Sequence, residues 1–65
     1  MDEQTATRHT LEWYHRFYEP TAPLKISAER QPNGRWHLEI ECESIPEVVR
    51  VEVDEEGLVS RRLGD

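Results

Sequence analysis

Apolar and polar residues alternate along the chain from Leu24 to Val53. A period of two is typical of a β-sheet with one buried face and one solvent-facing face. In the central segment the apolar set is Trp36, Leu38, Ile40 and Cys42, and the set on the opposite side is Glu39, Glu41 and Glu43. The pattern therefore predicts a sheet whose outer face carries carboxylates.

A helical pattern precedes the sheet. Apolar side chains recur at three- and four-residue intervals before Pro20, which predicts an amphipathic helix over about residues 8–18. These side chains are Leu11, Trp13, Tyr14, Phe17 and Tyr18. Thr7 or Thr10 can cap the start of the helix, and Pro20 ends it because a proline has no amide donor. Residues 1–7 are polar and are expected to lack fixed structure.

The best local signal is the first turn, at residues 31–34. Gln-Pro-Asn-Gly fits a type I turn followed by a left-handed glycine, which makes a three-residue hairpin loop. This loop pairs Ala28 with Leu38, Ile26 with Ile40 and Leu24 with Cys42. The rival two-residue loop would turn Glu39 and Glu41 toward the core, because a slip of one residue moves every side chain to the other face.

Two further strands are expected. The third runs over 48–54 after a connection at 44–47, and its apolar residues place Val49 opposite Cys42, Val51 opposite Ile40 and Val53 opposite Leu38. A glycine-terminated turn at 54–57 then leads into a short fourth strand over 58–63, in which Arg61 and Arg62 blunt an exposed edge.

The whole chain, residues 1–65, is thus predicted to be one small acidic domain with a sheet over about 24–63. The predicted fold class is α+β, in which the N-terminal amphipathic helix packs on one face of a three- to four-stranded antiparallel β-meander. This helix is the only element available to cover the apolar face.

Composition restricts the partners. The chain has 14 acidic and 8 basic residues and a net charge of −6, which disfavours direct binding to nucleic acid or to an anionic membrane. No segment approaches the roughly 20 apolar residues of a membrane span. Cys42 is the only cysteine, so no intramolecular disulfide forms, and a cytoplasmic location is expected.

Catalytic and metal-binding signatures are missing from the sequence. His9 and His15 are six residues apart, which does not place two ligands on one helical face. Cys42 is expected to be a small buried hydrophobe beside Leu24 and Val49, with no base to activate it. We therefore expect no enzymatic activity, no metal and no cofactor.

The outer face is the candidate partner-binding surface. The expected register places Glu39 beside Glu52, and it places His37 between Glu29 and Asp54. The residues predicted to bind a partner are Glu39, Glu41, Glu43, Glu52, Asp54, Glu55 and Glu56, together with the aromatic residues Trp13 and Tyr18. The alternative is a solvated face whose charges partly neutralise one another.

Three functions fit this surface. The first is a non-catalytic accessory or regulatory protein that binds a larger, basic protein, such as a nucleic-acid-binding one. The second is a phage-type inhibitor whose carboxylates, spaced about 6.8 Å apart along a strand, imitate a phosphate track. The third is a homodimeric structural component joined through Trp13 or Tyr18, since exposed aromatic residues are enriched at interfaces.

One resemblance to a known family lies in residues 34–63. Arg35-Trp36 opens a strand, Ile45-Pro46-Glu47 lies in the connection, Val51-Glu52-Val53-Asp54 precedes Glu56-Gly57, and Arg61-Arg62 follows. This run resembles the C-terminal half of gas vesicle accessory proteins of the O type. That family has a longer connection after its Ile-Pro and an aromatic residue before its arginine pair, and both are missing here. No function is carried over from it.

Overall fold

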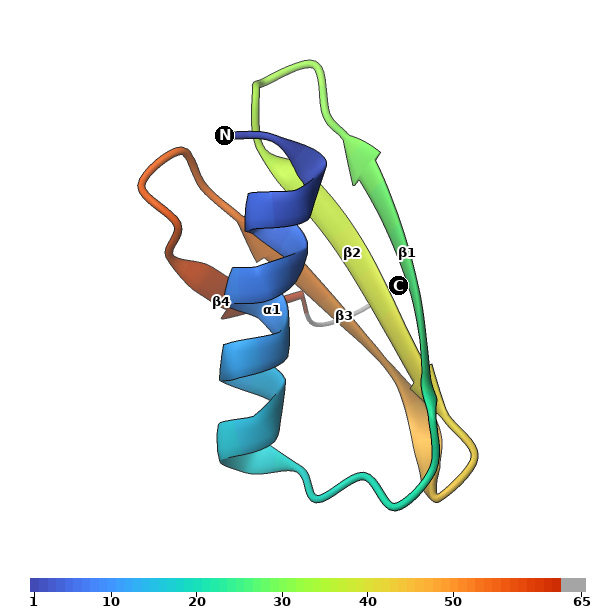
Figure 1. The fold of residues 1–65 in the computed structure, drawn as a ribbon. Coiled ribbons are helices and arrows are strands. Elements are labelled where there is room, and N and C mark those ends of the chain that lie inside the picture. The colour runs from blue at the N-terminus through green and yellow to red at the C-terminus, as the bar shows by residue number, and fades with distance from the viewer. Residues whose placement is uncertain (63–65) are drawn as a thin grey trace.

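A single helix lies across one face of a four-stranded antiparallel sheet in the computed structural model, which describes residues 1–62 (Figure 1). The elements are α1 (Glu3–Phe17), β1 (Leu24–Arg30), β2 (Trp36–Cys42), β3 (Ile45–Val53) and β4 (Val59–Arg61). The strands follow the chain order β1-β2-β3-β4 in the sheet. The predicted α+β meander with a covering N-terminal helix is confirmed.

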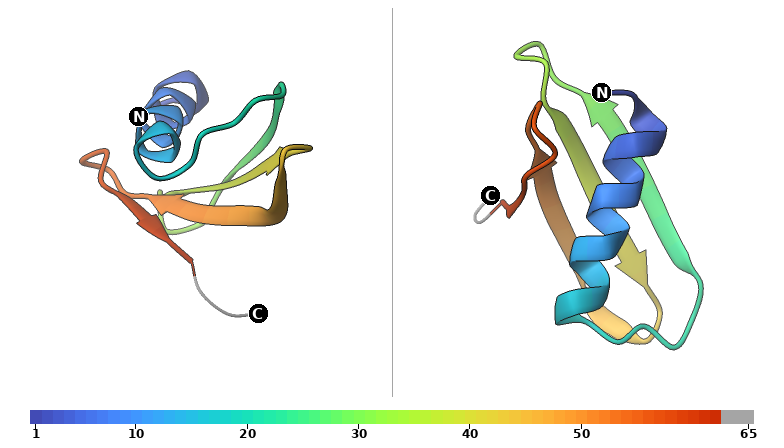
Figure 2. Two further views of the ribbon diagram at one scale, coloured as in Figure 1. Left: turned by 90° about the horizontal axis from the view of Figure 1, so that it is seen from below. Right: turned by 60° about the vertical axis from the view of Figure 1, so that its left-hand side comes forward.

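The apolar face of the sheet forms the core under α1 (Figure 2). The buried side chains of the sheet are Trp36, Leu38, Ile40, Val49, Val51 and Val53. Glu41 is exposed and Glu39 is half-buried on the opposite face, so the predicted sidedness of the central strands is confirmed. Burial of this apolar face supplies the main driving force for folding.

The helix begins earlier than predicted. Asp2 is its N-cap, because the Asp2 carboxylate accepts a hydrogen bond from the Thr5 amide at 2.8 Å. The Trp36 indole also donates to the Met1 carbonyl oxygen at 3.2 Å, which holds the N-terminus against the sheet. A start near residue 8, a cap at Thr7 or Thr10 and a structureless segment over 1–7 are therefore wrong. Thr10 is buried within the helix.

The buried side of α1 also differs from the predicted stripe. Ala6, Thr10 and Tyr14 are fully buried, and their four-residue spacing makes one line along the helix. Small side chains at the first two positions let the helix approach the sheet closely. Phe17, which was predicted to belong to the stripe, is 65% exposed.

The β1–β2 hairpin has the predicted register, with Leu24 opposite Cys42, Ile26 opposite Ile40 and Ala28 opposite Leu38. Gly34 adopts φ +87°, and its amide donates to the Gln31 carbonyl oxygen at 2.9 Å. Gly57 repeats this conformation with φ +88° in the β3–β4 turn, as the sequence predicted. A left-handed backbone favours glycine at both positions.

The predicted β2–β3 register is wrong by two residues. Strand β3 begins at Ile45, which pairs with Cys42 across a turn at residues 43–44, and the register shifts between Ile40 and Cys42. As a result Val49 lies opposite Ile40, Val51 opposite Leu38 and Val53 opposite Trp36. The irregular segment contains Pro46, which cannot donate to the ladder and is tolerated at a bulge. Strand β4 is shorter than predicted, and residue 63 lies outside the described residues.

Candidate functional site

The centre of the outer face is neutralised by ion pairs, because the two-residue shift brings Arg50 rather than Glu52 opposite Glu39. Arg50 Nε lies 3.3 Å from Glu39 Oε2. Glu52 accepts from Arg35 Nη1 at 3.0 Å. The predicted pair of adjacent, uncompensated carboxylates at Glu39 and Glu52 is therefore wrong.

His37 extends this network toward β4. Its cross-strand neighbours are Glu29 and Glu52, so the predicted position of Asp54 beside it is wrong. His37 Nε2 lies 3.2 Å from Glu39 Oε2, and Arg62 Nη1 lies 3.1 Å from His37 Nδ1. Arginine can only donate, so Nδ1 accepts and Nε2 carries the hydrogen that faces Glu39. The hydrogen bond from His37 and the charge of Arg50 lower the pKa of Glu39.

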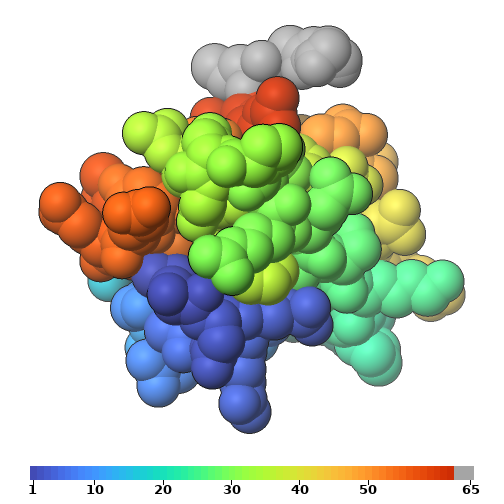
Figure 3. Space-filling view, turned by 90° about the horizontal axis from the view of Figure 1, so that it is seen from above, coloured from blue at the N-terminus to red at the C-terminus, as the bar shows by residue number. Residues whose placement is uncertain are grey.

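A second acidic group lies in the β3–β4 turn. Asp54 holds the turn in place, because its Oδ1 accepts from the amides of Glu56 and Leu58, each at 2.9 Å. Glu55 and Glu56 are exposed beside a hollow of about 320 Å³ that also includes Asn33 and Arg35. Figure 3 looks down on this end, where the β1–β2 loop (green) lies beside the β3–β4 loop (orange).

Another acidic concavity lies at the opposite end of the sheet, beside the β2–β3 turn. We call it the acidic hollow. It measures about 590 Å³ and is lined by Pro23, Leu24, Lys25, Glu41, Cys42, Glu43, Ile45, Pro46, Glu47 and Val48. A smaller concavity of about 260 Å³ shares Lys25 and Glu41 and continues along β1 and β2 to Ser27 and Glu39. The two concavities thus adjoin at Lys25 and Glu41.

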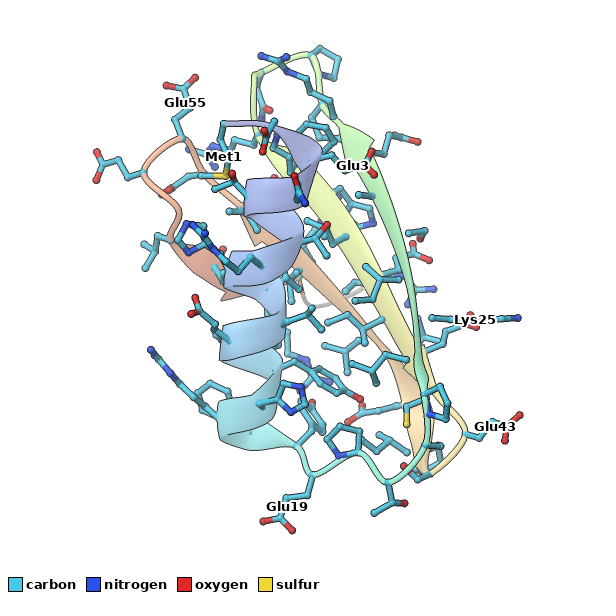
Figure 4. The ribbon with its side chains drawn as sticks, viewed as in Figure 1. Met1, Glu3, Glu19, Lys25, Glu43 and Glu55 are labelled. Carbon is cyan, nitrogen blue, oxygen red and sulfur yellow. The ribbon has the colours of Figure 1, made fainter. Side chains whose placement is uncertain are left out.

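Charge in the acidic hollow is unbalanced. Glu41 and Glu43 are exposed, and neither makes an ion pair within the described chain. Glu47 is already occupied, because its Oε2 lies 2.9 Å from Arg61 Nη2. Lys25 is the only cation among the lining residues, and its side chain points away from the sheet, as does Glu43 (Figure 4). Sequence reasoning missed Pro46 and Val48 as lining residues because it placed Pro46 in a loop.

Cys42 lies at the base of the acidic hollow and is 7% exposed. Its Sγ lies 3.0 Å from Ser44 Oγ and 3.5 Å from the Ala22 carbonyl oxygen. The Ser44 hydroxyl lowers the pKa of the Cys42 thiol. Neither Ser44 nor the Ala22 carbonyl is a base that could take the thiol proton.

The aromatic residues lie on the helix side, away from the outer face. Tyr18 is engaged within the fold, because its hydroxyl donates to Glu47 Oε1 at 3.2 Å and accepts from Arg61 Nη1 at 2.8 Å. Trp13 is half-buried and lies against Phe17, with ring centroids 5.2 Å apart. The most exposed of the large apolar side chains are instead Phe17 and Leu58, at 65% and 68%. The periodicity of the sequence did not predict that Leu58, which follows the Gly57 turn, would be exposed.

No group of three or more His, Cys, Asp or Glu residues within 1–62 has the geometry to hold a metal ion. Within the same residues, no helix combines the length and apolar composition that crossing a membrane requires.

Comparisons with protein-family models, curated proteins and solved structures return no match for this chain. The predicted site residues therefore have to be interpreted from their own geometry. That geometry divides them into a neutralised centre, an acidic turn, the acidic hollow and a helix-side aromatic group.

Proposed function

We propose that this chain is a non-catalytic accessory or regulatory module that binds a basic segment of a larger protein in the acidic hollow. The observation that carries the proposal is the uncompensated charge of Glu41 and Glu43 beside the apolar surface of Pro46 and Val48. A cytoplasmic location is part of the proposal, since Cys42 is a free thiol.

The chemistry of the acidic hollow favours an arginine- or lysine-rich segment with an aliphatic residue between the cations. Two carboxylates on one rim can each accept from a guanidinium, which binds carboxylates bidentately. Val48 and Pro46 provide apolar contact for the intervening side chain. The net charge of −6 steers a basic partner toward the whole molecule, and the acidic hollow supplies the local recognition.

The test uses a fluorescent peptide of alternating arginine and leucine, titrated with the protein at low and high salt. We expect Glu41→Gln combined with Glu43→Gln to weaken binding about tenfold, which corresponds to about 1.4 kcal/mol from two partly exposed charge pairs. Glu55→Gln combined with Glu56→Gln is the matched control, because it removes the same charge at the other end of the sheet. That control should change affinity by about twofold or less.

Three results would reject this site. Equal losses for both double variants would mean attraction to net charge only, and a loss confined to the Glu55 and Glu56 variant would place binding at the β3–β4 turn. Binding that is unaffected by salt would remove the electrostatic argument altogether. A protein captured from the native host should likewise bind the wild-type chain and not the Glu41 and Glu43 variant.

Nucleic-acid mimicry is not favoured by this geometry. Arg50 and Arg62 interrupt the line of carboxylates that a phosphate track requires, since Arg50 pairs with Glu39 and Arg62 with His37. A duplex presents uninterrupted negative charge along its backbone. The acidic hollow beside Glu41 suits a short peptide better.

A further inference from the structure

Strand β1 is an open edge of the sheet. It has seven residues and, among the strands of residues 1–62, pairs only with β2, on one side. Its inward side chains Leu24, Ile26 and Ala28 pack against the core but are only half-buried. The other edge strand, β4, has three residues, too few to offer a long ladder. An unprotected edge of this length is a template for another strand.

The direction of the free backbone groups follows from the hairpin. The Gln31 amide donates to the Arg35 carbonyl oxygen at 2.7 Å, so residues 31 and 35 form a hydrogen-bonded pair. Such pairs alternate along an antiparallel ladder, and therefore Glu29, Ser27 and Lys25 direct their amides and carbonyls toward β2. The amides and carbonyls of residues 24, 26, 28 and 30 consequently point to the open edge.

We propose that a second copy of this chain pairs with this edge, β1 against β1, in an antiparallel register centred on Ser27. Lys25 then lies opposite the second copy's Glu29, and Ile26 lies opposite the second copy's Ala28. A two-fold axis through Ser27 repeats both pairs, so the contact carries two Lys–Glu pairs on its outer face. The two sheets join into one continuous sheet with both helices on the same side.

Charge and length select this register and this occupant. Ser27 is the middle residue of Leu24–Arg30, so the centred register alone overlaps the full strand. Sliding the second copy by two residues places Lys25 either opposite Ser27 or opposite a residue beyond the end of the strand. The charge pairs are lost in both cases. Opposite charges that face each other across strands stabilise the pairing, whereas like charges destabilise it. Edge lysine usually opposes strand addition, but here a copy of the same strand supplies its counter-charge.

The test measures the mass of the protein by sedimentation equilibrium at concentrations up to about 1 mM, the range of weak association. Wild type should approach twice the 7.7 kDa of one chain. Lys25→Glu gives a strand with glutamate at both positions, and Glu29→Lys gives one with lysine at both. Each variant alone should dimerise at least about tenfold more weakly, because both facing pairs become like-charged.

An equimolar mixture of the two variants should recover the dimer, because every facing pair in the mixed species is again opposite in charge. Circular dichroism checks that each variant is folded, and both positions are exposed in the monomer. The proposal is overturned by a wild-type chain that stays at the monomer mass, or by a dimer that neither substitution weakens, which would indicate another surface such as Phe17 and Leu58. A mixture that does not recover the dimer would also overturn it.

Discussion

Removing the hydroxyl of Tyr14 should stabilise the fold. Tyr14 is fully buried, and its hydroxyl has no hydrogen-bond partner within the described residues. The ring itself is well packed, since it stacks on Tyr18 with centroids 4.7 Å apart and an interplanar angle of 17°. Tyr14→Phe keeps this ring and deletes only the unpartnered polar atom.

The size of the effect follows from the cost of burying an unsatisfied polar group, about 1–3 kcal/mol. We expect Tyr14→Phe to raise the free energy of unfolding by about 1 kcal/mol, the low end of that range. The low end applies because phenylalanine leaves unfilled the space that the hydroxyl occupied. Tyr18→Phe is the matched control, because that hydroxyl contacts Glu47 and Arg61. The control should lower the free energy of unfolding by about 0.5–1.5 kcal/mol.

The assay is urea unfolding followed by tryptophan fluorescence, near neutral pH and again under alkaline conditions. Burial raises the pKa of Tyr14, and the nearby Cys42 and Tyr18 raise it further. The folded pKa therefore lies above the unfolded value of about 10, and the stability from this group is lost as pH rises through the folded pKa. The phenylalanine variant lacks this loss, so its advantage over wild type should widen above pH 10 or so.

Two outcomes would refute the reasoning about Tyr14. A variant destabilised by about 1 kcal/mol or more would mean that the hydroxyl is hydrogen-bonded, for instance to a buried water. An advantage that stays constant with pH would mean that the hydroxyl is not desolvated in the fold.

Three further substitutions test the helix start, a turn and the outer-face network. Asp2→Ala should lower the free energy of unfolding by about 1 kcal/mol in urea, because it removes the N-cap, and no change would mean that the helix does not begin there. Gly57→Ala should cost about 1–2 kcal/mol, since φ is +88° and the new Cβ would lie 3.0 Å from His9 Nε2. Glu39→Gln should flatten the loss of stability below about pH 4. The pKa of Glu39 is lower in the folded state than in the unfolded state, so the carboxylate stabilises the fold at a pH above its unfolded-state pKa. This stabilisation is lost as the pH falls through the folded-state pKa. An acid-unfolding curve identical to wild type would contradict the Glu39 network.

The first hairpin could be predicted from the sequence because its alternatives differ in burial. A one-residue slip, which the rival two-residue Asn33-Gly34 loop would produce, would have placed Glu39 and Glu41 in the core, and this burial alone decided the register. The β2–β3 register could not be predicted in the same way, since a slip of two residues leaves every side chain on its face. It depends instead on the turn at 43–44 and on the irregularity around Pro46, neither of which changes the apolar pattern.

Because the β2–β3 register could not be predicted, the predicted distribution of charge on the outer face differs from the observed one. With Arg50 opposite Glu39, the centre of the predicted acidic face is neutral, and the free carboxylates lie at the two ends of the sheet. The helix start was missed for a different reason. Ala6 and Thr10 are small, so hydrophobic periodicity gives them little weight although they are fully buried.

Lys25 connects the acidic hollow with the open edge of β1, because it lines the first and belongs to the second. In the proposed dimer the second copy's Glu29 attracts Lys25, which leaves Glu41 and Glu43 less compensated. Dimerisation should therefore strengthen the binding of a basic peptide, and by linkage saturating peptide should lower the dimer dissociation constant by that factor once for each of the two copies. Sedimentation of wild type with and without the arginine–leucine peptide measures this coupling, and a dimer loosened by the peptide would show that the two surfaces compete for Lys25 instead.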